Sequence, residues 1–342
     1  MSPEPAALLP PSADRVALAQ SAAAAADRAA AAVLFATYRA ELAPNTRAAQ
    51  DDDLARLVLF FTDVGVPVGA LGTDPHAWAG CSWGLLEAFK RWLLAEGYAI
   101  ATINRTLATT KSYIKLATKA GALTADAAVL IATVHGYGGR AARNLDADRP
   151  TTRRSTKKPT ALPIALAQAR TLKAQPTDTP QGRRDALILA LLLDHGLRVG
   201  ELAALTPATI DIERETLTFY REKVGLTQTH RLSAATLHAA RSYLHDLSPL
   251  PKQLLRGSRK NGQLAGTMGV RAIQARLRLL GKQIGLTVLS PHDCRHYWAT
   301  AVVAGGTDLL ALQEAGGWSS LEMPRRYVER AAIANDRVKL DI

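Results

Sequence analysis

The feature that most constrains this chain is the stretch at residues 146–163, where regular patterning stops. Apolar residues recur at helical or strand spacing before and after it, but none recur within it. The stretch mixes Pro, Thr and Ser with basic side chains, a composition typical of a linker between separately folded parts. Length supports the same reading, because 342 residues exceed what one typical hydrophobic core holds. We therefore predict two domains joined by a basic linker.

The half before the linker has the pattern of a small helical bundle. Apolar residues step by three and four in several successive segments. The predicted helices are 27–42, one around Leu54–Phe61, 83–96 and one that opens at Thr102. Four or five helices with short connections form such a bundle, here over residues 26–145. Residues 1–25 are rich in Pro and Ala and are predicted to be a flexible tail.

The half after the linker mixes helices with short segments that alternate in polarity, as strands do. Its expected elements, in order, are helices at 165–173 and 183–194, strands at 210–213, 216–221 and 226–232, a helix at 234–247, a loop at 249–266 and a helix at 270–284. The expected fold is mainly α with a small antiparallel β-sheet in the second domain. That domain, an α+β unit, covers residues 164–342.

Charge is distributed unevenly between the halves of this chain, whose net charge is +12. Residues 1–145 hold 13 Lys/Arg against 12 Asp/Glu, which leaves 29 against 18 for residues 146–342. A basic second half indicates a polyanionic partner, most simply nucleic acid. Arg153 and Arg154 of the linker would then lie along phosphates, although basic linkers are often only solvated.

Two predicted helices carry candidate DNA contacts on their polar sides. The helix at 270–284 has an apolar stripe on one side and, on the other, side chains suited to a major groove, where Arg reads guanine and Gln reads adenine. These side chains are Arg271, Gln274, Arg278 and Lys282. Arg105 and Lys111 lie off the apolar side of the fourth helix of the first half. A solvated charged face has the same pattern, but the neighbouring basic loop favours groove contact.

Several kinds of protein are disfavoured by the sequence. Cys81 and Cys294 are far apart and suggest no disulfide framework, so a reducing compartment fits. Residues 1–20 lack the pattern of a signal peptide, and no apolar stretch is long enough to span a bilayer. We expect a cytoplasmic or nucleoid-associated protein of bacterial or phage context, without a membrane partner. No metal-ligand spacing or phosphate-loop motif occurs, so no metal or cofactor is expected.

The stretch from Ser290 to Tyr327 concentrates residues that phosphodiester chemistry needs. Ser290 can cap a helix whose first position suits Pro291. His292 then lies in the first turn, with Arg295 three residues on and on the same face. A helix N-terminus favours a phosphate through its free N–H groups, and Arg295 adds a bidentate clamp.

Other parts of such a site occur before and after this helix. Arg198 follows an apolar helix at a Gly-bounded turn, and Lys223 lies at a hairpin turn, from which its stem can reach a cleft and donate a proton. Trp318 offers an indole N–H without acid–base chemistry. Tyr327 follows nine residues later, after two arginines. Each residue alone has an ordinary structural explanation, and the inference depends on their joint occurrence in order.

The order Arg, Lys, His-x-x-Arg, Trp and Tyr resembles the tyrosine recombinase (phage integrase) family, and the Trp is most similar to its Cre-type members. The resemblance extends over about residues 30–342. It implies a DNA-binding core-binding domain at 26–145 and a catalytic domain with a C-terminal oligomerisation helix. The implied catalytic residues are Arg198 and Arg295 as phosphate clamps and Tyr327 as the nucleophile, with Glu201 either orienting Arg198 or holding the active-site network. Lys223, His292 and Trp318 complete the implied catalytic set.

The activity that the resemblance implies is site-specific DNA recombination. Double-stranded DNA would be cut and rejoined through a 3′-phosphotyrosyl intermediate and a Holliday junction, by a homo-tetramer on two duplexes, without metal or ATP. Two alternatives remain at this point. A type IB topoisomerase-like enzyme uses similar residues but acts alone, and a DNA-binding protein with a silent active site would be expected to lack part of the set.

Overall fold

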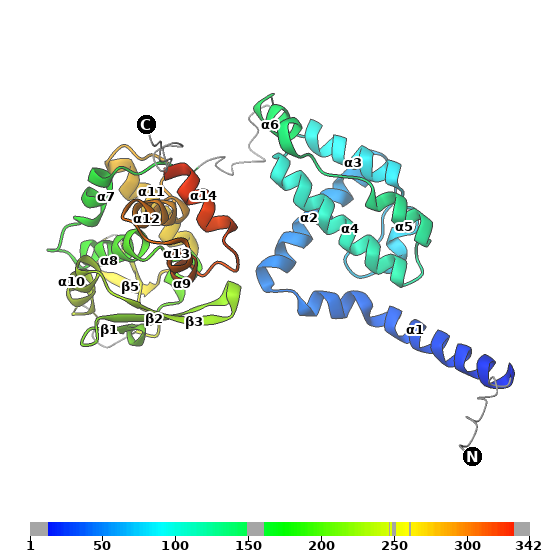
Figure 1. Cartoon of the computed structure of the whole chain (residues 1–342), viewed down its shortest axis with the longest axis horizontal. Helices are drawn as coiled ribbons and strands as arrows, with labels where there is room; N and C mark the ends of the chain where they lie inside the picture. Colours follow the sequence, from blue (N-terminus) through cyan, green and yellow to red (C-terminus); the bar gives the residue numbers. More distant parts are fainter. Residues whose placement is uncertain (1–12, 149–160, 246, 248–250, 260, 332–342) are drawn as a thin grey trace, which may run out of the picture. The chain divides into compact units, whose positions relative to one another are not determined.

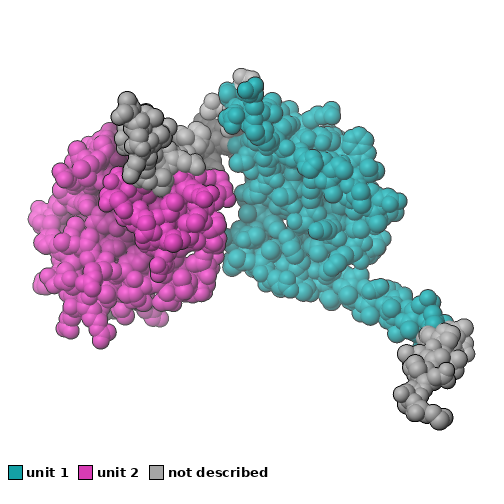
Figure 2. Space-filling model, in the orientation of Figure 1, with its two compact units in different colours: residues 1–157 teal, residues 158–342 magenta. Residues whose placement is uncertain are grey.

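The computed structural model describes residues 13–148, 161–245, 247, 251–259 and 261–331 (Figure 1). The chain divides into two compact units, residues 1–157 and 158–342 (Figure 2). This division falls within the stretch at which the sequence patterning stops. Helices dominate both units, and the described strands all belong to unit 2. The predicted fold class, mainly α with a small antiparallel sheet in the second domain, is confirmed.

Unit 1 is a bundle of helices around one apolar core. Its elements are α1 (Ala13–Glu41), α2 (Pro44–Asp63), the 3₁₀ helix η1 (Pro75–Trp78), α3 (Trp83–Ala95), α4 (Ile100–Lys119), α5 (Ala125–Ala132) and α6 (Gly139–Asp148). The core brings together aromatic side chains from several of these helices, including Phe60, Phe89 and Tyr113, together with Trp78. Helix α4 buries Ile103 and Ile114 within it, as the apolar spacing predicts.

Two boundaries differ from the sequence-based expectation. The flexible tail expected over residues 1–25 is wrong for its second half, because α1 already begins at Ala13. Alanine is the strongest helix former, and the run Ala22–Ala26 extends the expected helix backwards. At the other end of unit 1, α6 reaches Asp148, inside the expected linker. Residues 1–12 and 149–160 lie outside the described residues, and so do the candidate DNA contacts Arg153 and Arg154.

Unit 2 combines helices with two small antiparallel sheets. Its elements are α7 (Leu166–Lys173), α8 (Pro180–Asp194), α9 (Val199–Ala204), η2 (Pro207–Thr209), β1 (Ile210–Asp211), β2 (Thr216–Arg221), η3 (Glu222–Val224), β3 (Leu226–Arg231), α10 (Ala234–Leu244), β4 (Arg256–Ser258), β5 (Leu264–Thr267), α11 (Val270–Gln283), α12 (Pro291–Ala304), α13 (Leu309–Gly316) and α14 (Glu322–Ala331). The segment at 249–266 was expected to be a loop, and this is wrong where β4 and β5 form a hairpin.

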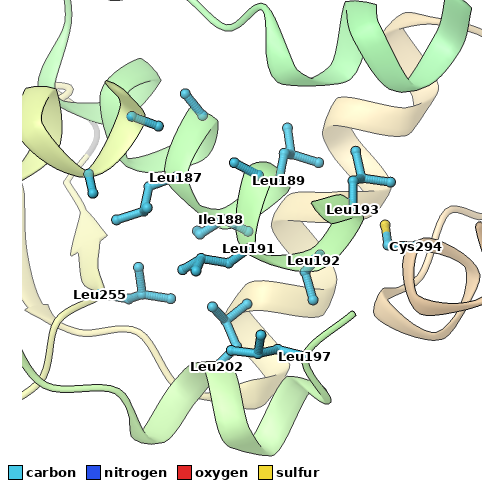
Figure 3. Packing of buried hydrophobic residues seen from close by; sticks show 14 of the residues in the cluster. Leu187, Ile188, Leu189, Leu191, Leu192, Leu193, Leu197, Leu202, Leu255 and Cys294 are labelled. Carbon is cyan, nitrogen blue, oxygen red and sulfur yellow. The ribbon is translucent and has the colours of Figure 1, made fainter. Parts of the chain in front are cut away.

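Helix α8 is the centre of unit 2. Its side chains from Leu187 to Leu193 are buried on every side, which is the pattern of a helix enclosed by other elements. Helices α7, α10 and α12 pack against it. Figure 3 shows the leucines of α8 beside Cys294 of α12 and Leu202 of α9. This core holds the end of α8, and therefore the turn that carries Arg198, close to α12.

The three-stranded sheet, in the order β1-β2-β3, carries Lys223 at a hairpin tip. Strand β2 alternates, with Leu217, Phe219 and Arg221 buried on one face. Arg221 pairs with Leu226 at the base of the tip. The tip consists of η3 and Gly225, whose φ of +64° is readily adopted by glycine.

Candidate active site

Arg198 and Glu201 are brought together by the start of α9. Arg198 is the N-cap residue, and its backbone N–H donates to Glu201 Oε2 at 2.8 Å. Its side-chain Nη1 donates to Glu201 Oε1, also at 2.8 Å, and its Nη2 donates to the carbonyl oxygen of Gly317 at 3.1 Å. The predicted pairing of Glu201 with Arg198 is therefore present. Because the Arg198 side chain is 24% exposed, part of its guanidinium is open to solvent.

Arg295 lies on α12, whose N-terminus forms as predicted. Ser290 is the N-cap and accepts from the backbone N–H of Asp293, with Pro291 in the first turn. Arg295 is only 5% exposed and donates to the carbonyl oxygens of Gly196 and Gly316. Burial, together with the nearby positive charges of Arg198 and Arg221, lowers the pKa of Arg295 to about 9. A buried cation in positive surroundings is suited to an incoming anion.

The last two residues of α13 and its C-cap residue Gly317 form a turn that supplies three successive carbonyl oxygens to three different arginines. Ala315 accepts from Arg221 at 2.6 Å, Gly316 accepts from Arg295, and Gly317 accepts from Arg198. A side chain cannot be added at either glycine without a clash. A Cβ at Gly316 would lie 1.8 Å from the Trp318 ring, and one at Gly317 would lie 2.5 Å from Arg221 Cδ. The turn thus places Trp318 and the arginines together.

Trp318 and Tyr327 complete the buried part of the site. The Arg295 guanidinium carbon lies 4.4 Å from the centre of the Trp318 ring, a cation–π contact. The Trp318 and Tyr327 rings lie 5.7 Å apart between centroids. Tyr327, on α14, is 3% exposed, and its ring also meets the edge of His296 at 4.9 Å. The structure thus brings together five predicted residues, namely Arg198, Glu201, Arg295, Trp318 and Tyr327.

Lys223 and His292 are placed differently from the other five. Both side chains are exposed, Lys223 at the hairpin tip and His292 in the first turn of α12. Within the part of the chain that the structure describes, no hydrogen bond or ion pair joins either of them to the buried cluster. His292 precedes Arg295 by three residues in the same helix, so both lie at its N-terminal end.

Sequence reasoning missed Arg221. Its side chain is 0% exposed, and Nη1 donates to both carboxylate oxygens of Glu201, at 2.9 and 2.8 Å. Burial lowers its pKa, although the charge of Glu201 opposes this effect. A signal for it was available, because alternation in β2 puts an arginine on the same face as Leu217 and Phe219. A charged residue on an apolar strand face indicates a buried partner.

The predicted groove-contacting side chains of α11 are exposed, except that Gln274 is half-buried. Arg271, Arg278 and Lys282 therefore have room to reach a ligand, whereas Arg276 of the same helix is committed to Asp185, with Nε to Oδ2 at 2.8 Å. The polar face predicted from the sequence is thus present on α11. Whether it contacts DNA stays a prediction.

The two predicted contacts in unit 1 have partners inside that unit. Arg105 donates from Nε and Nη2 to buried Asp53, at 3.1 and 2.9 Å, while its side chain remains 49% exposed. The ammonium of Lys111 donates to the carbonyl oxygens of Ala132 and Val134, which close the end of α5. Burial lowers the pKa of Lys111. Lys111 therefore has a structural role that the sequence did not indicate.

The described residues contain neither a metal-binding cluster nor a helix that could span a membrane. No group of three or more His, Cys, Asp or Glu side chains gathers there in a way that could hold a metal ion. Within the same residues, none of the helices has the length and apolar character needed to cross a bilayer.

Comparison with known proteins identifies the family. Residues 164–332 match the family model described as "Phage integrase family". The chain is 27% identical over 316 residues to tyrosine recombinase XerC of Herpetosiphon aurantiacus, covering 90% of this chain and 91% of that protein. It is 29% identical over 262 residues to XerC of Corynebacterium glutamicum, covering 74% and 75%.

Solved structures with a similar fold come from the same family. A Tn1549 transposon integrase in complex with a circular intermediate DNA matches with a TM-score of 0.61 and 16% identity, covering 87% of this chain and 94% of that one. A lambda integrase dimer bound to a COC′ core site matches at 0.59 and 13%, covering 90% and 79%. At such identities the likeness concerns the fold. Together with the sequence matches, it shows that this chain belongs to the phage integrase family of tyrosine recombinases, enzymes that cleave and rejoin DNA.

Proposed function

We propose that this chain is a site-specific DNA recombinase in which Tyr327 attacks the scissile phosphate. The observation that carries the proposal is the arrangement of Arg198, Arg295 and Trp318 beside Tyr327. Two guanidinium groups bind the backbone at Gly316 and Gly317, and the indole ring of Trp318 packs against the phenol of Tyr327. A pentacoordinate phosphorane requires such groups from a site that stabilises charge. The relatives are recombinases, and the topoisomerase-like and silent alternatives have no comparable support.

In the cleavage step, the Tyr327 oxygen forms a bond to phosphorus and the bond to the 5′ oxygen breaks. A phenol has a pKa of about 10 and is mostly protonated at neutral pH, so its proton must leave as attack proceeds. We assign its acceptance to His292 and the donation of a proton to the leaving 5′ oxygen to Lys223. Arg198 and Arg295 bind the non-bridging oxygens, and Trp318 adds a hydrogen bond.

Three of these groups must change position before they act. Tyr327 is 3% exposed, so a phosphate reaches its oxygen only if α14 shifts from its observed packing. Lys223 and His292 are exposed, and bound DNA would draw them toward its backbone. Because the phosphotyrosine keeps the energy of the phosphodiester, a 5′ hydroxyl can reverse the step without a nucleotide cofactor. Two such rounds through a Holliday junction exchange two duplexes.

DNA recognition is assigned to α11. Arg271, Gln274, Arg278 and Lys282 would read base edges in a major groove. In unit 1 we assign a phosphate contact to Arg105, whose side chain is half-exposed. Lys111 is a weaker candidate because its ammonium already serves α5. A DNA substrate also implies action at the nucleoid of a bacterial or phage-infected cell.

We further propose assembly as a tetramer on two duplexes. An apolar groove beside α12 supports this, with a volume of about 740 Å³ and a lining that includes Leu162, Ile164, Tyr297 and Ala301. The C-terminal segment of a neighbouring copy is its proposed occupant. That segment, 332–342, lies outside the described residues, and the oligomerisation helix remains a prediction.

The decisive experiment traps the covalent intermediate. DNA nicked next to the scissile phosphate loses a short strand after cleavage, which leaves the protein attached to its 3′ end. We expect the labelled peptide of the wild-type protein to contain Tyr327. Tyr327→Phe should lower adduct formation by at least about 10³-fold, the scale for loss of a nucleophile, with DNA binding retained.

Tyr220→Phe is the matched control, because Tyr220 lies on the exposed face of β2, outside both the arginine cluster and the apolar groove. It should form the adduct at close to the wild-type rate. An adduct on Tyr297 or on a serine, or cleavage by Tyr327→Phe, would show that the nucleophile is wrongly assigned.

A further inference from the structure

Arg221 is buried at the back of the arginine cluster and cannot touch a bound phosphate. Its side chain is 0% exposed, and the Phe219 ring lies 4.7 Å from the guanidinium carbon. Burial of a guanidinium is costly unless its donors are satisfied. The role of Arg221 must therefore lie in the groups to which it donates hydrogen bonds. The proposed catalytic residues do not include Arg221.

The first partner of Arg221 is Glu201, which also holds Arg198. Glu201 Oε1 accepts from the Nη1 atoms of both arginines, and Oε2 accepts from Arg221 Nη1 and from the backbone N–H of Arg198. One carboxylate thus balances one of two guanidinium charges. With Arg221 present, Arg198 keeps positive charge for a phosphate. Without it, the whole negative charge of Glu201 would fall on Arg198.

The second partner is the turn that carries Trp318. Arg221 Nη2 donates to the carbonyl oxygen of Ala315 at 2.6 Å, and Nε donates to Gln228 on β3. Gln228 in turn donates to the carbonyl oxygen of Glu314 at 2.6 Å. The base of the Lys223 hairpin is therefore tied to the end of α13. Both ties meet at Arg221.

We propose that Arg221 is a positioning residue for the cleavage reaction. It neutralises Glu201, so that Arg198 retains its charge for the scissile phosphate, and it fixes the turn that precedes Trp318. This inference rests on the proposed function, because it presupposes that Arg198 binds the phosphate. It assigns no contact with DNA to Arg221 itself.

The test measures single-turnover cleavage of nicked DNA at saturating protein, together with the Kd for DNA. We expect Arg221→Met to cleave about 10²-fold more slowly, as when one preorganised donor is lost, with the Kd little changed. Adding Glu201→Gln to Arg221→Met removes the carboxylate charge that Arg221 no longer balances. We expect the double variant to recover about tenfold of the lost rate.

A second substrate separates positioning from a general structural effect. A methylphosphonate at the scissile position lacks one negative charge, so charge on Arg198 matters less for it. Arg221→Met should then lose less than about tenfold relative to wild type. The control is Arg56→Met, which breaks a pair between an arginine and buried Asp53 in unit 1. Arg56→Met should change the cleavage rates of the phosphodiester and the methylphosphonate substrates by the same factor.

If Arg221→Met does not fold, Arg221→Gln takes its place, because its amide keeps a hydrogen-bond donor for Glu201 but has no charge to balance the carboxylate. We expect a smaller loss with the same dependence on the charge of the substrate. Equal losses on both substrates, or no recovery with Glu201→Gln, would overturn the inference. Failure of the proposed function looks different, because wild type would then form no Tyr327 adduct, or Arg198→Ala would cleave normally.

Discussion

Asp185 and Glu201 are both buried carboxylates of unit 2 that accept from arginines, but their surroundings differ in charge balance. Asp185 Oδ1 accepts from Arg184 and Oδ2 accepts from Arg276, while Arg184 also donates to Arg256 O and Ser258 Oγ. These contacts tie α8 to α11 and β4. Glu201 has Arg198 and Arg221, and Arg295 lies close by without a carboxylate partner among the described residues.

This difference distinguishes a structural network from a functional one. Around Asp185 the arginines end on protein acceptors, and Arg184 is 1% exposed. In each network one carboxylate faces two arginines, and Arg276 and Arg198 are similarly exposed, at 20% and 24%. Arg295 adds a further positive charge beside Glu201, so the excess is larger there. Excess charge in a buried place destabilises the fold unless a ligand balances it. Uncompensated charge is therefore a better indicator of a functional site than burial alone.

The largest expected effect is on stability and concerns Asp185. Asp185→Ala strands buried Arg184 and half-buried Arg276, so we expect the free energy of unfolding to fall by about 3–5 kcal/mol. Urea titration measures this. Asp211→Ala is the control, because its 40% exposed side chain pairs with Arg214 Nη1 at 3.9 Å and accepts from the backbone N–H of Arg214 at 2.9 Å. Its effect should stay near about 1 kcal/mol. A similarly small loss for Asp185→Ala would remove the distinction drawn between the networks.

Arg198→Ala should have the opposite effect, because it should slow cleavage while leaving stability nearly unchanged. Its partner Glu201 keeps Arg221, so the free energy of unfolding should change little. Cleavage of nicked DNA should slow by about 10²–10³-fold, because a preorganised donor to the phosphorane is lost. Exposed Arg214→Ala serves as the control and should cleave normally. A variant that unfolds easily but cleaves at the wild-type rate would make Arg198 structural.

Helix α11 extends the comparison to DNA reading, because one of its arginines is pinned and another is exposed. Arg271→Ala should cost about 1–3 kcal/mol of binding free energy at one base pair, if the side chain contacts a guanine. Arg276→Ala, by contrast, should lower stability through Asp185. Binding to a panel of single-base variants of the site measures the first effect. An equal loss on every sequence would demote Arg271 to a phosphate contact.

A pH dependence is expected on the Glu201 side, where the rings of His195 and His230 lie 5.9 Å apart between centroids. Burial lowers the pKa of each to about 4, whereas an unfolded histidine titrates near 6.5. As pH falls through this window, the unfolded chain binds protons first, so stability present above about 6.5 is lost toward about 4. The expected slope is about 1 kcal/mol per pH unit for each histidine.

Urea unfolding at several pH values between 7 and 5 checks this slope. His195→Gln should flatten it, and His238→Gln, at an exposed position of α10, should not. The same slope in both variants would mean that other groups cause the pH dependence.

Much of this structure was predictable from side-chain patterns. The cap at Ser290, the apolar spacing of α8 and α11 and the ordered set from Arg198 to Tyr327 all have direct sequence signals. Helix α1 was underestimated because Pro at the very start of the chain suggested a tail, although Ala continues a helix well. The β4–β5 hairpin was missed because β4 has only three residues, too few to show alternation.

The hydrogen-bond network of the site was less predictable, because it depends on contacts between segments that are distant in the sequence. Arg221 was identified only as the end of a strand, since nothing local shows that Glu201, twenty residues earlier, would face it. Lys111 has the look of a surface lysine, and only the tertiary fold brings the end of α5 to it. Tertiary hydrogen bonds of this kind leave no spacing in the sequence.

The turn at 315–317 affects what mutation can do to this enzyme. Its three arginine acceptors are main-chain carbonyl oxygens, and every amino acid supplies one. No point substitution deletes these acceptors, as it can delete a guanidinium or a carboxylate. Substitution can only displace them, most readily at Gly316 and Gly317, where a methyl group has no room. The positions of these three acceptors thus depend on the path of the backbone. That path requires glycine at positions 316 and 317.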